Sequence, residues 1–395
     1  MITKIEKFET KTFLDSTAAV FEHGDKYVIK SGNGSEYSAG MFFGFMDVVS
    51  MQGKHFSAKV DVVATGKKTM PMAMVLFYNE EGKKIEADYF FKGEKTFTVE
   101  TEVPKEAVKA EIDLMSFGYG DYAVEFTEPE IEITDKKPHR IAHIATAYIE
   151  IENSTEANMK HVLEVIDMAG SAEDKPDIIC FTEGVHDLRT GKWYFLTEES
   201  DEIKAVLESA KKNSIYVLFT CHEEDEKGYR YNSAFFISPD GEILGKYRKS
   251  HLTLSELKGG LVPGDEIPVF DLPFGKFGIL ICWDQWFYEA SRMIASKGAE
   301  MLFWLTRGYH EERLITRARD NGMYYISSNP SPEKCCICHP TTGEIIARGS
   351  GVQGYASAKI DLDERPVSEY KSFGVNGGND RDIFINELRP DLYNY

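Results

Sequence analysis

Long apolar segments are missing from this sequence of 395 residues. No run of about 18 consecutive apolar residues occurs, and a helix needs roughly that many to cross a membrane. The first residues, MITKIEKFETKTF, also lack the apolar core of a secretory signal peptide. We therefore expect a cytoplasmic protein with neither a targeting peptide nor a membrane-spanning helix.

Positive charge is in short supply as well. The chain holds 45 Lys and Arg against 65 Asp and Glu, which gives a formal net charge of -20. Nucleic acids and anionic membrane surfaces attract proteins through basic patches. The composition therefore argues against nucleic acid and membrane as partners, and it carries no information on a reaction.

Cysteine is sparse too, with six residues at positions 180, 221, 282, 335, 336 and 338. These spacings do not form a disulfide framework, and a chain of this length does not need one. The run from Cys335 to His339, CCICH, suggests metal ligands. A structural zinc site, however, requires a second, distant pair of ligands. The sequence lacks that pair, so we expect no metal.

The first part of the chain, up to about residue 135, has the pattern of short strands. Apolar and polar residues alternate over 56–62, which is the period of a half-buried strand. Similar runs lie at 72–78, 97–99, 123–126 and 131–133. No amphipathic helix pattern interrupts the series. The spacing predicts an all-β domain over residues 1–135, an antiparallel sandwich of the jelly-roll kind.

A polar linker at 134–138 separates this series from a chain with a different pattern. From residue 138 to 395, short apolar runs alternate with segments of helical periodicity. The strand-like run 140–147, for example, precedes a helix that Asn153 and Glu156 can cap. The alternation predicts a layered α/β domain in which helices cover the faces of a sheet.

Three predicted strands of this second domain each deliver a polar residue directly after an apolar run. Glu183 follows 178–182, Lys249 follows the strand of a hairpin, and Cys282 follows 277–281. Strand ends in open α/β sheets converge on one crevice, where active sites lie. In such a crevice a carboxylate can take the proton of a thiol, and an ammonium can stabilise an oxyanion.

Each of these residues also has an ordinary structural alternative. Cysteine commonly serves as a small buried hydrophobe, and charged residues are frequent at strand ends. Cys282 stands just ahead of a predicted helix, and helix N-termini and nearby cations lower the pKa of a thiol. The combination of Glu183, Lys249 and Cys282 favours a nucleophilic site more strongly than any one of them does.

With these residues in view, the second domain resembles the nitrilase, or carbon–nitrogen hydrolase, superfamily over about 138–395. Three blocks carry the resemblance in the family's order and spacing: PDIICFTE (176–183), GKYRKSHL (245–252) and GILICWDQWFYE (278–289). The tail LRPDLY (388–393) is similar to the family's C-terminal signature. The resemblance implies a four-layer α-β-β-α fold and assembly into a homodimer or larger homo-oligomer. It also implies that CCICH is a core strand.

On this resemblance, Glu183 is the general base, Lys249 the catalytic lysine and Cys282 the nucleophile. Glu256 is the counterpart of an accessory glutamate, and the backbone N–H of Trp283 donates to the oxyanion. The implied reaction attacks an amide-type carbonyl or a nitrile carbon, releases ammonia or an amine, and leaves a thioester that water hydrolyses. It requires no metal and no organic cofactor.

The residues around these blocks bear on the substrate. The segments CWDQWF (282–287) and RKSH (248–251) are similar to the N-carbamoylputrescine amidohydrolase branch, whereas the segment after Thr306 departs from it. Thr182 and Tyr288 replace prolines that are usual in the family. We expect a small-molecule amide or N-carbamoyl substrate, with nitrile hydrolysis as the alternative.

Four further residues are expected to line the substrate pocket: His186, His251, Arg307 and Tyr309. They lie next to the motif blocks or in the segment that follows Thr306. For the two histidines the alternative is a local hydrogen-bonding role.

The role of the first domain stays open. It could cover the mouth of the active site, extend an oligomer interface or bind a glycan, and its fold does not decide among these. Tyr119 and Tyr122 are candidates for a sugar-stacking platform, although aromatics in a sandwich more often belong to the core. A glycan-binding or scaffold protein with a vestigial hydrolase domain is therefore the alternative from a different functional class.

Overall fold

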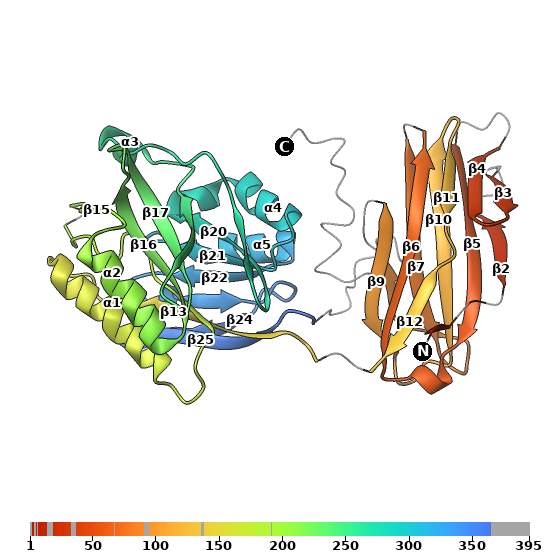
Figure 1. Ribbon diagram of the computed structural model, residues 1–395, viewed down its shortest axis with the longest axis horizontal. Coiled ribbons are helices and arrows are strands. Elements are labelled where there is room, and N and C mark those ends of the chain that lie inside the picture. The colour runs from red at the N-terminus through yellow and green to blue at the C-terminus, as the bar shows by residue number, and fades with distance from the viewer. Residues whose placement is uncertain are drawn as a thin grey trace. The chain divides into compact units, whose positions relative to one another are not determined.

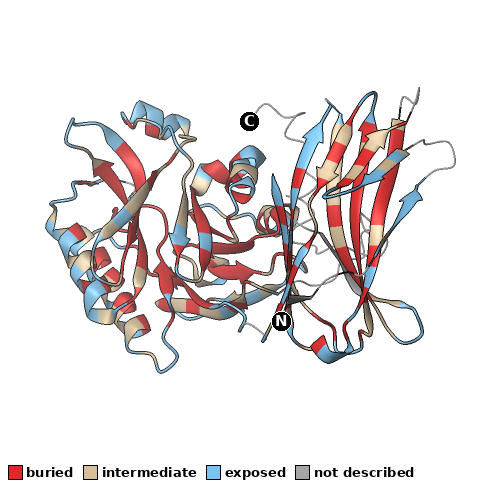
Figure 2. Ribbon diagram, turned by 45° about the vertical axis from the view of Figure 1, so that its right-hand side comes forward, coloured by how far each residue is buried: buried red, intermediate tan, exposed pale blue. Residues whose placement is uncertain are grey.

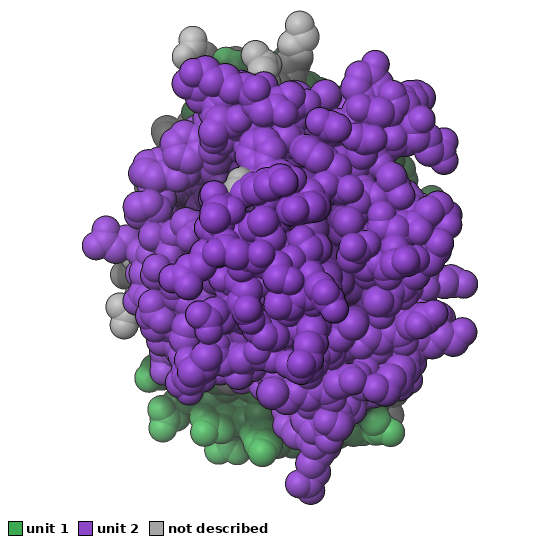
Figure 3. Space-filling model, turned by 90° about the vertical axis from the view of Figure 1, so that its left-hand side faces the viewer, with its two compact units in different colours: residues 1–138, 365–386 green, residues 139–364, 387–395 purple. Residues whose placement is uncertain are grey.

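A computed structural model of the protein describes residues 2–3, 5, 7–13, 19–32, 37–66, 68–90, 95–135, 138–190 and 192–364. These residues form two compact units, one within 1–138 and one within 139–364 (Figure 3). In the described ranges, no helix is both long enough and apolar enough to cross a membrane. The C-terminal signature predicted at 388–393 lies outside the described residues.

The first unit is built from antiparallel strands (Figure 1). Its elements are β1 (Ile2–Thr3), β2 (Phe8–Thr12), β3 (Ala19–His23), β4 (Tyr27–Ser31), β5 (Tyr37–Asp47), η1 (Val49–Met51), β6 (His55–Thr65), β7 (Thr69–Tyr78), β8 (Lys84–Phe90), β9 (Thr96–Glu102), β10 (Lys109–Tyr119), β11 (Ala123–Phe126) and β12 (Glu130–Thr134). One sheet has the order β1-β12-β6-β11-β4-β3, with β9 paired to β6, and the other has the order β2-β5-β10-β7-β8.

The core of this unit follows from the alternation in the sequence. On β6, Phe56 and Val60 are buried, whereas Lys59 and Asp61 between and after them are exposed. The two tyrosines proposed as a platform have different environments. Tyr122 is buried and its hydroxyl donates to the carbonyl of Ser38, while Tyr119 is exposed. The pair therefore does not offer one continuous stacking surface.

The second unit alternates strands and helices, as the periodicity predicts. Its elements are β13 (Ile141–Tyr148), α1 (Thr155–Gly170), β14 (Ile178–Cys180), β15 (Phe195–Leu196), α2 (Asp201–Asn213), β16 (Tyr216–Glu224), β17 (Arg230–Ile237), β18 (Ile243–Arg248), α3 (Leu254–Lys258), β19 (Val269–Leu272), β20 (Gly275–Ile281), η2 (Cys282–Trp286), α4 (Tyr288–Ser296), β21 (Met301–Leu305), α5 (Glu311–Asn321), β22 (Tyr324–Ser328), η3 (Pro332–Lys334), β23 (Cys336–Cys338), β24 (Ile345–Arg348) and β25 (Gly354–Asp361).

Two sheets and two pairs of helices make four layers in this unit (Figure 1). One sheet runs β18-β17-β16-β14-β13-β25, with β15 paired to β16, and the other runs β19-β20-β21-β22-β23-β24. The sheets face each other, and the Thr146 hydroxyl donates to the carbonyl of Ser327 across 2.7 Å. Helices α1 and α2 lie on the outer face of the first sheet, and α4 and α5 on the outer face of the second (Figure 1).

Local sequence explains how the helices dock. Helix α1 begins after Ser154, whose hydroxyl accepts from the Ala157 N–H, so Ser154 and not Asn153 is the N-cap. Asn153 instead accepts a hydrogen bond from the backbone of Thr190. On β20, a Cβ at Gly278 would lie 2.4 Å from Ile294 of α4. Glycine at this position therefore allows α4 to approach the sheet closely.

The strands of both sheets are largely buried, with exposed residues on the outer helix surfaces (Figure 2). Parallel pairing joins β13, β14 and β16 in one sheet and β20, β21 and β22 in the other. Strand β14 leads to Glu183 and β20 leads to Cys282, while the antiparallel strand β18 leads to Lys249. The fold thus brings the ends of strands from both sheets to one region.

Candidate active site

Cys282 occupies a strained turn between a strand and a short helix. It follows β20 and opens the 3-10 helix η2, and its φ of 44° lies in the left-handed region that residues other than glycine rarely adopt. The Ile281 N–H donates to Asp284 at 2.9 Å, and the Trp304 indole N–H donates to the carbonyl of Cys282 at 3.0 Å. These bonds on both sides hold the turn in place.

A buried ammonium lies between two carboxylates near this turn. Lys249 is 1 % exposed, and its Nζ lies 2.8 Å from Glu183 Oε1. The same Nζ lies 2.9 and 3.1 Å from the two carboxylate oxygens of Glu256. The structure therefore brings Lys249 together with Glu183, which is 66 positions away in the sequence, and with Glu256, which is 7 positions away.

Asn232 completes this cluster, and the sequence analysis did not find it. Its side-chain N–H group donates to Glu183 Oε1 and to Glu256 Oε1, both at 2.9 Å. Its backbone carbonyl accepts from the Lys249 N–H at 2.8 Å, because β17 and β18 pair at this point. The sequence feature that could have indicated Asn232 is its position as a polar residue near the start of the otherwise apolar strand β17.

Glu256 owes its position to the short helix α3. The Thr253 hydroxyl accepts from the Glu256 N–H, and the Glu256 carboxylate accepts from the Thr253 N–H at 2.7 Å. This reciprocal capping box fixes the first turn of α3. The loop that carries Glu256 is thereby ordered next to Lys249, where the resemblance placed an accessory glutamate.

Charge in the cluster is set by competition between burial and pairing. Burial raises the pKa of Glu183, but the Lys249 ammonium and hydrogen bonds from Lys249, Cys282 and Asn232 outweigh it, so the pKa is lowered. Glu256 shows the same balance and a lowered pKa. Burial lowers the pKa of Lys249, but the charges of Glu183, Cys282 and Glu256 raise it overall. At neutral pH the cluster therefore holds two carboxylates and one ammonium.

The thiol itself is less acidic than the sequence suggested. Burial and the charge of Glu183 raise the pKa of Cys282 to about 11, although Lys249, the Thr306 hydroxyl and the Gly308 backbone act in the opposite direction. The lowered thiol pKa that the sequence suggested is not found, because burial and the Glu183 carboxylate outweigh the effect of the Lys249 ammonium.

Asp284 ties the turn of Cys282 to the loop of Lys249. Its carboxylate is fully buried and accepts from the Tyr247 hydroxyl at 2.7 Å and from the His251 N–H at 2.9 Å. The same carboxylate accepts from the Ile281 N–H. The sequence analysis used this stretch only as a guide to substrate, and the contacts assign Asp284 a positioning role.

The two histidines expected in the pocket make contacts within the protein. His186 has no exposed surface and its Nε2 lies 2.7 Å from the carbonyl of Tyr194, so it lies beneath the surface. His251 is partly exposed, its Nδ1 lies 3.0 Å from Asp284, and its ring stacks on Phe287 at 4.0 Å.

The other two expected pocket residues support the site from the loop after β21. The Arg307 guanidinium donates to the carbonyls of Glu183 and Gly184, so it braces the backbone that carries Glu183. The Tyr309 hydroxyl donates to Glu311 at 2.7 Å, and its ring stacks on Trp304. Trp283, the proposed oxyanion donor through its backbone, is the second residue of η2.

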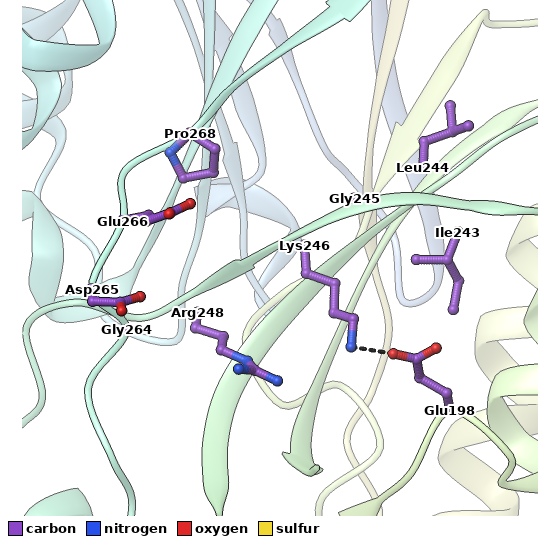
Figure 4. Close-up of a pocket in the computed structure, with 10 residues that line it drawn as sticks. All are labelled: Glu198, Ile243, Leu244, Gly245, Lys246, Arg248, Gly264, Asp265, Glu266 and Pro268. Atoms are coloured by element: carbon purple, nitrogen blue, oxygen red, sulfur yellow. Dashed lines mark hydrogen bonds and ion pairs between the residues drawn. The ribbon is translucent and has the colours of Figure 1, made fainter. Parts of the chain in front are cut away.

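A groove of about 520 Å³ lies along β18 and is lined by residues of β18 and of the segment 264–268 (Figure 4). Lys246 and Arg248 line it, and both pair with the buried Glu223 beneath. In Figure 4 the Lys246 ammonium also points to Glu198. Because residues along a strand alternate between its faces, Lys246 and Arg248 point away from the buried cluster that contains Lys249.

Metal ligands do not gather in the part of the chain that the structure describes, where no three His, Cys, Asp or Glu side chains form a group able to hold an ion. The cysteines of the CCICH run are buried in and beside β23 of the second sheet.

Comparison with known proteins gives three kinds of similarity. A sequence model of the carbon-nitrogen hydrolase family matches residues 142–365. Omega-amidase NIT2-B of Xenopus laevis is 35% identical over 176 residues, which are 39% of this chain and 64% of that protein. A probable nitrilase of Schizosaccharomyces pombe is 29% identical over 211 residues, 49% of this chain and 74% of that protein. The chain thus spans less than two thirds of the amphibian relative.

A solved structure shares the fold. The crystal structure of a carbon-nitrogen hydrolase from Helicobacter pylori superposes with a TM-score of 0.52 at 21% sequence identity. The match covers 65% of this chain and 98% of that protein.

Proposed function

The chain belongs to the carbon-nitrogen hydrolase family, and from this premise we propose that it hydrolyses the carbon–nitrogen bond of a small amide or N-carbamoyl compound. Cys282 is the proposed nucleophile, Glu183 the general base and Lys249 the electrostatic stabiliser. The observation that carries the proposal is the contact of one buried ammonium with two buried carboxylates, near the strained turn that carries Cys282.

Proton transfer from sulfur to Glu183 begins the proposed reaction. At neutral pH, Glu183 is ionised because its pKa is lowered, and Cys282 is protonated because its pKa is raised. As Sγ forms a bond to the carbonyl carbon, the thiol proton passes to the carboxylate. A positioned general base of this kind contributes about 10²- to 10⁴-fold to a rate.

The negative charge then resides on the former carbonyl oxygen. The Lys249 ammonium, held in place by Glu183 and Glu256, is available to stabilise it without further rearrangement. The backbone N–H of Trp283 is the second donor, because the first amides of a helix have no partner within the helix. Each such donor lowers the barrier by about 3 kcal/mol.

Collapse of the tetrahedral intermediate breaks the carbon–nitrogen bond. Glu183 returns its proton to the leaving nitrogen, so that ammonia or an amine departs and Cys282 carries the acyl group as a thioester. Water then attacks the thioester while Glu183 takes a proton from it, and the thiol re-forms as the acid leaves. Asn232 and Glu256 remain unchanged and keep Glu183 and Lys249 in position.

The substrate class draws support from the relatives. Several of them are named omega-amidases, which favours an amide substrate. One is named a probable nitrilase, so nitriles belong in the same test. The resemblance of 282–287 to N-carbamoylputrescine amidohydrolases keeps N-carbamoyl amines among the candidates.

For the whole protein we propose a cytoplasmic homodimer or larger homo-oligomer. The boundary lies between residues 135 and 138, and the first unit is an accessory domain of the jelly-roll kind. The two antiparallel sheets of that unit support this assignment. Sedimentation velocity of the full chain tests the oligomeric state, and a single species of monomer mass at micromolar concentration would contradict it.

Ammonia release over a panel of ω-amides, N-carbamoyl amines and nitriles tests the proposed activity. We expect turnover of amides or N-carbamoyl amines, its loss in Cys282→Ala, and an unchanged rate in Cys338→Ala, which replaces a buried cysteine of β23. Mass spectrometry of the stopped reaction should find the acyl group on Cys282. Activity in Cys282→Ala would refute the mechanism, and turnover of nitriles alone would refute the substrate class. No turnover of any compound would favour the scaffold alternative.

A further inference from the structure

The proposed base and the proposed nucleophile stand on different sheets. Strand β14 of one sheet leads to Glu183, and β20 of the other sheet leads to Cys282. The spacing between the carboxylate and the sulfur therefore depends on how the two sheets are joined at this edge. Proton transfer requires a spacing of about 3 Å, and a misplacement of about 1 Å can cost about 100-fold in rate. A contact that joins the strand ends beside these residues thus bears directly on the reaction.

Thr182 makes such a contact. It lies directly before Glu183 and is 1 % exposed, and its hydroxyl donates to the carbonyl of Thr306 at 2.8 Å. Thr306 follows β21 of the second sheet, the strand that pairs with β20. The bond therefore joins the residue before the base to the strand beside that of the nucleophile. A proline, which is usual at this position in the family, has no hydroxyl to donate.

The segment after Thr306 borders the sulfur. The Thr306 hydroxyl donates to the carbonyl of Gly308 at 2.6 Å, and a Cβ on Gly308 would lie 3.9 Å from Cys282 Sγ. The same segment also reaches back to the base, because the Arg307 guanidinium donates to the carbonyl of Glu183 at 3.0 Å. The two segments thus exchange hydrogen bonds in both directions beside the sulfur.

Each end of the bond between Thr182 and Thr306 is anchored in its own sheet. The Thr182 carbonyl accepts from the Thr220 hydroxyl of β16, and the Thr306 N–H donates to the carbonyl of Ser328 at 2.9 Å. The Thr306 carbonyl accepts a second hydrogen bond from the Asn329 side chain at 3.0 Å. Loss of the Thr182 hydroxyl therefore leaves this buried carbonyl with a donor, so that the fold can survive the change.

We propose that Thr182 is a positioning residue whose hydroxyl sets the spacing between Glu183 and Cys282. This inference rests on the proposed function of the same site and adds to it a residue outside the buried charge cluster. Thr182 acts through the Thr306 carbonyl and touches neither the substrate nor the reacting atoms. When the hydroxyl is removed, the two strand ends separate slightly, and the carboxylate of Glu183 lies farther from the sulfur.

Thr182→Val tests the hydroxyl in the full-length protein, because valine keeps the shape of threonine and loses the donor. With the best substrate of the ammonia-release panel, we expect kcat to fall about tenfold and KM to change by less than about twofold. Thr182→Ser keeps the hydroxyl and should retain most of the activity, whereas Thr182→Ala should lose it. The serine and alanine variants supply the same comparison if the valine variant does not fold.

Thr146→Val is the matched control. The Thr146 hydroxyl is also buried and also joins the two sheets, through its bond of 2.7 Å to the carbonyl of Ser327. It belongs to β13, which leads to none of the three proposed reacting residues. This variant should keep kcat within about twofold of the wild type. Equal losses of kcat in Thr146→Val and Thr182→Val would overturn the proposal, and so would an unchanged kcat or a rise in KM alone in Thr182→Val.

The thiol of Cys282 reports the spacing without any substrate. The charge of Glu183 raises the pKa of this thiol, while Lys249 acts in the opposite direction and stays paired with Glu256. A larger distance to Glu183 therefore lowers the thiol pKa. Widening from about 4 Å to about 5 Å, at an effective dielectric constant of about 20, corresponds to about half a pH unit.

Iodoacetamide labelling over a range of pH measures this shift. The midpoint for Cys282 should fall by about half a pH unit in Thr182→Val and should keep its wild-type value in Thr146→Val. A midpoint that does not move, or that rises, would refute the positioning role while leaving hydrolysis itself intact. If no compound of the panel is turned over, the proposed function fails, and the labelling midpoint still decides whether Thr182 sets the spacing.

Discussion

Replacing Glu183 by Gln should make the Cys282 thiol more acidic while abolishing hydrolysis. Two effects raise the pKa of the Cys282 thiol: burial and the negative charge of Glu183. Lys249, which lowers it, remains paired with Glu256 in the variant. If Glu183 is the base that takes the thiol proton, its removal leaves a thiol that ionises more readily but cannot be activated at the moment of attack.

The size of the effect follows from the charge that is removed. A unit charge about 4 Å away contributes about 4 kcal/mol at an effective dielectric constant of about 20, which corresponds to about three pH units of pKa. Solvent entering the altered site will reduce this, so we expect a fall of about one to three pH units from the value of about 11. A fall of two units raises the thiolate fraction at pH 8 about 100-fold, and the weaker nucleophilicity of a more acidic thiol offsets about one order of magnitude.

Iodoacetamide labelling between pH 6 and 11 measures this directly. At pH 8, Glu183→Gln should label Cys282 about tenfold faster than the wild type does, and its rate should level off at a lower pH. The five other cysteines are buried, so Cys282→Ala gives the background. Glu256→Gln, which removes the other carboxylate at Lys249, should lower the thiol pKa less.

Two results would contradict this account. A wild-type thiol that titrates below pH 8 would mean that the resting site is a thiolate–ammonium pair. A rise of the thiol pKa in Glu183→Gln would mean that the carboxylate stabilises the thiolate and does not act as a base.

Three further predictions follow from the same contacts. The pKa of Glu183 is lowered, so its carboxylate stays ionised down to a lower pH than an ordinary glutamate does. The value of kcat/KM should therefore fall only as the pH drops below about 4.5, and a loss of activity centred near pH 7 would contradict this. Asn232→Leu removes a donor from two buried carboxylates and should lower the free energy of unfolding by about 2 to 3 kcal/mol in urea titrations; an unchanged midpoint would show that the bonds contribute nothing. Trp304→Phe keeps an aromatic side chain but loses the indole N–H that holds the Cys282 carbonyl, so kcat should fall about tenfold with KM unchanged, whereas a rise in KM alone would mean that Trp304 acts on binding.

Much of the second unit could be predicted because the relevant signals are local. Apolar runs and the polar residues after them marked the strand ends that carry Glu183, Lys249 and Cys282. The exact ends of helices were harder to predict where they depend on a single hydrogen bond. Ser154 caps α1 in place of Asn153, because the choice between adjacent polar residues depends on which side chain reaches the N–H of Ala157.

Contacts between distant segments could not be predicted from the residues alone. Asn232 lies on β17, and nothing local indicates that its side chain meets two carboxylates from other elements. His186 illustrates the reverse case. It follows Glu183 closely in the sequence, yet the turn buries it against the carbonyl of Tyr194.

The sequence by itself determined which chemical groups are present, the order of the strands and helices that carry them, and the family to which the chain belongs. The tertiary structure decided how those groups act. A pKa depends on burial and on neighbours that come from other elements, so only the fold makes Cys282 a thiol beside an ionised Glu183. For the same reason, only the fold shows that the Lys249 ammonium is paired with Glu183 and Glu256.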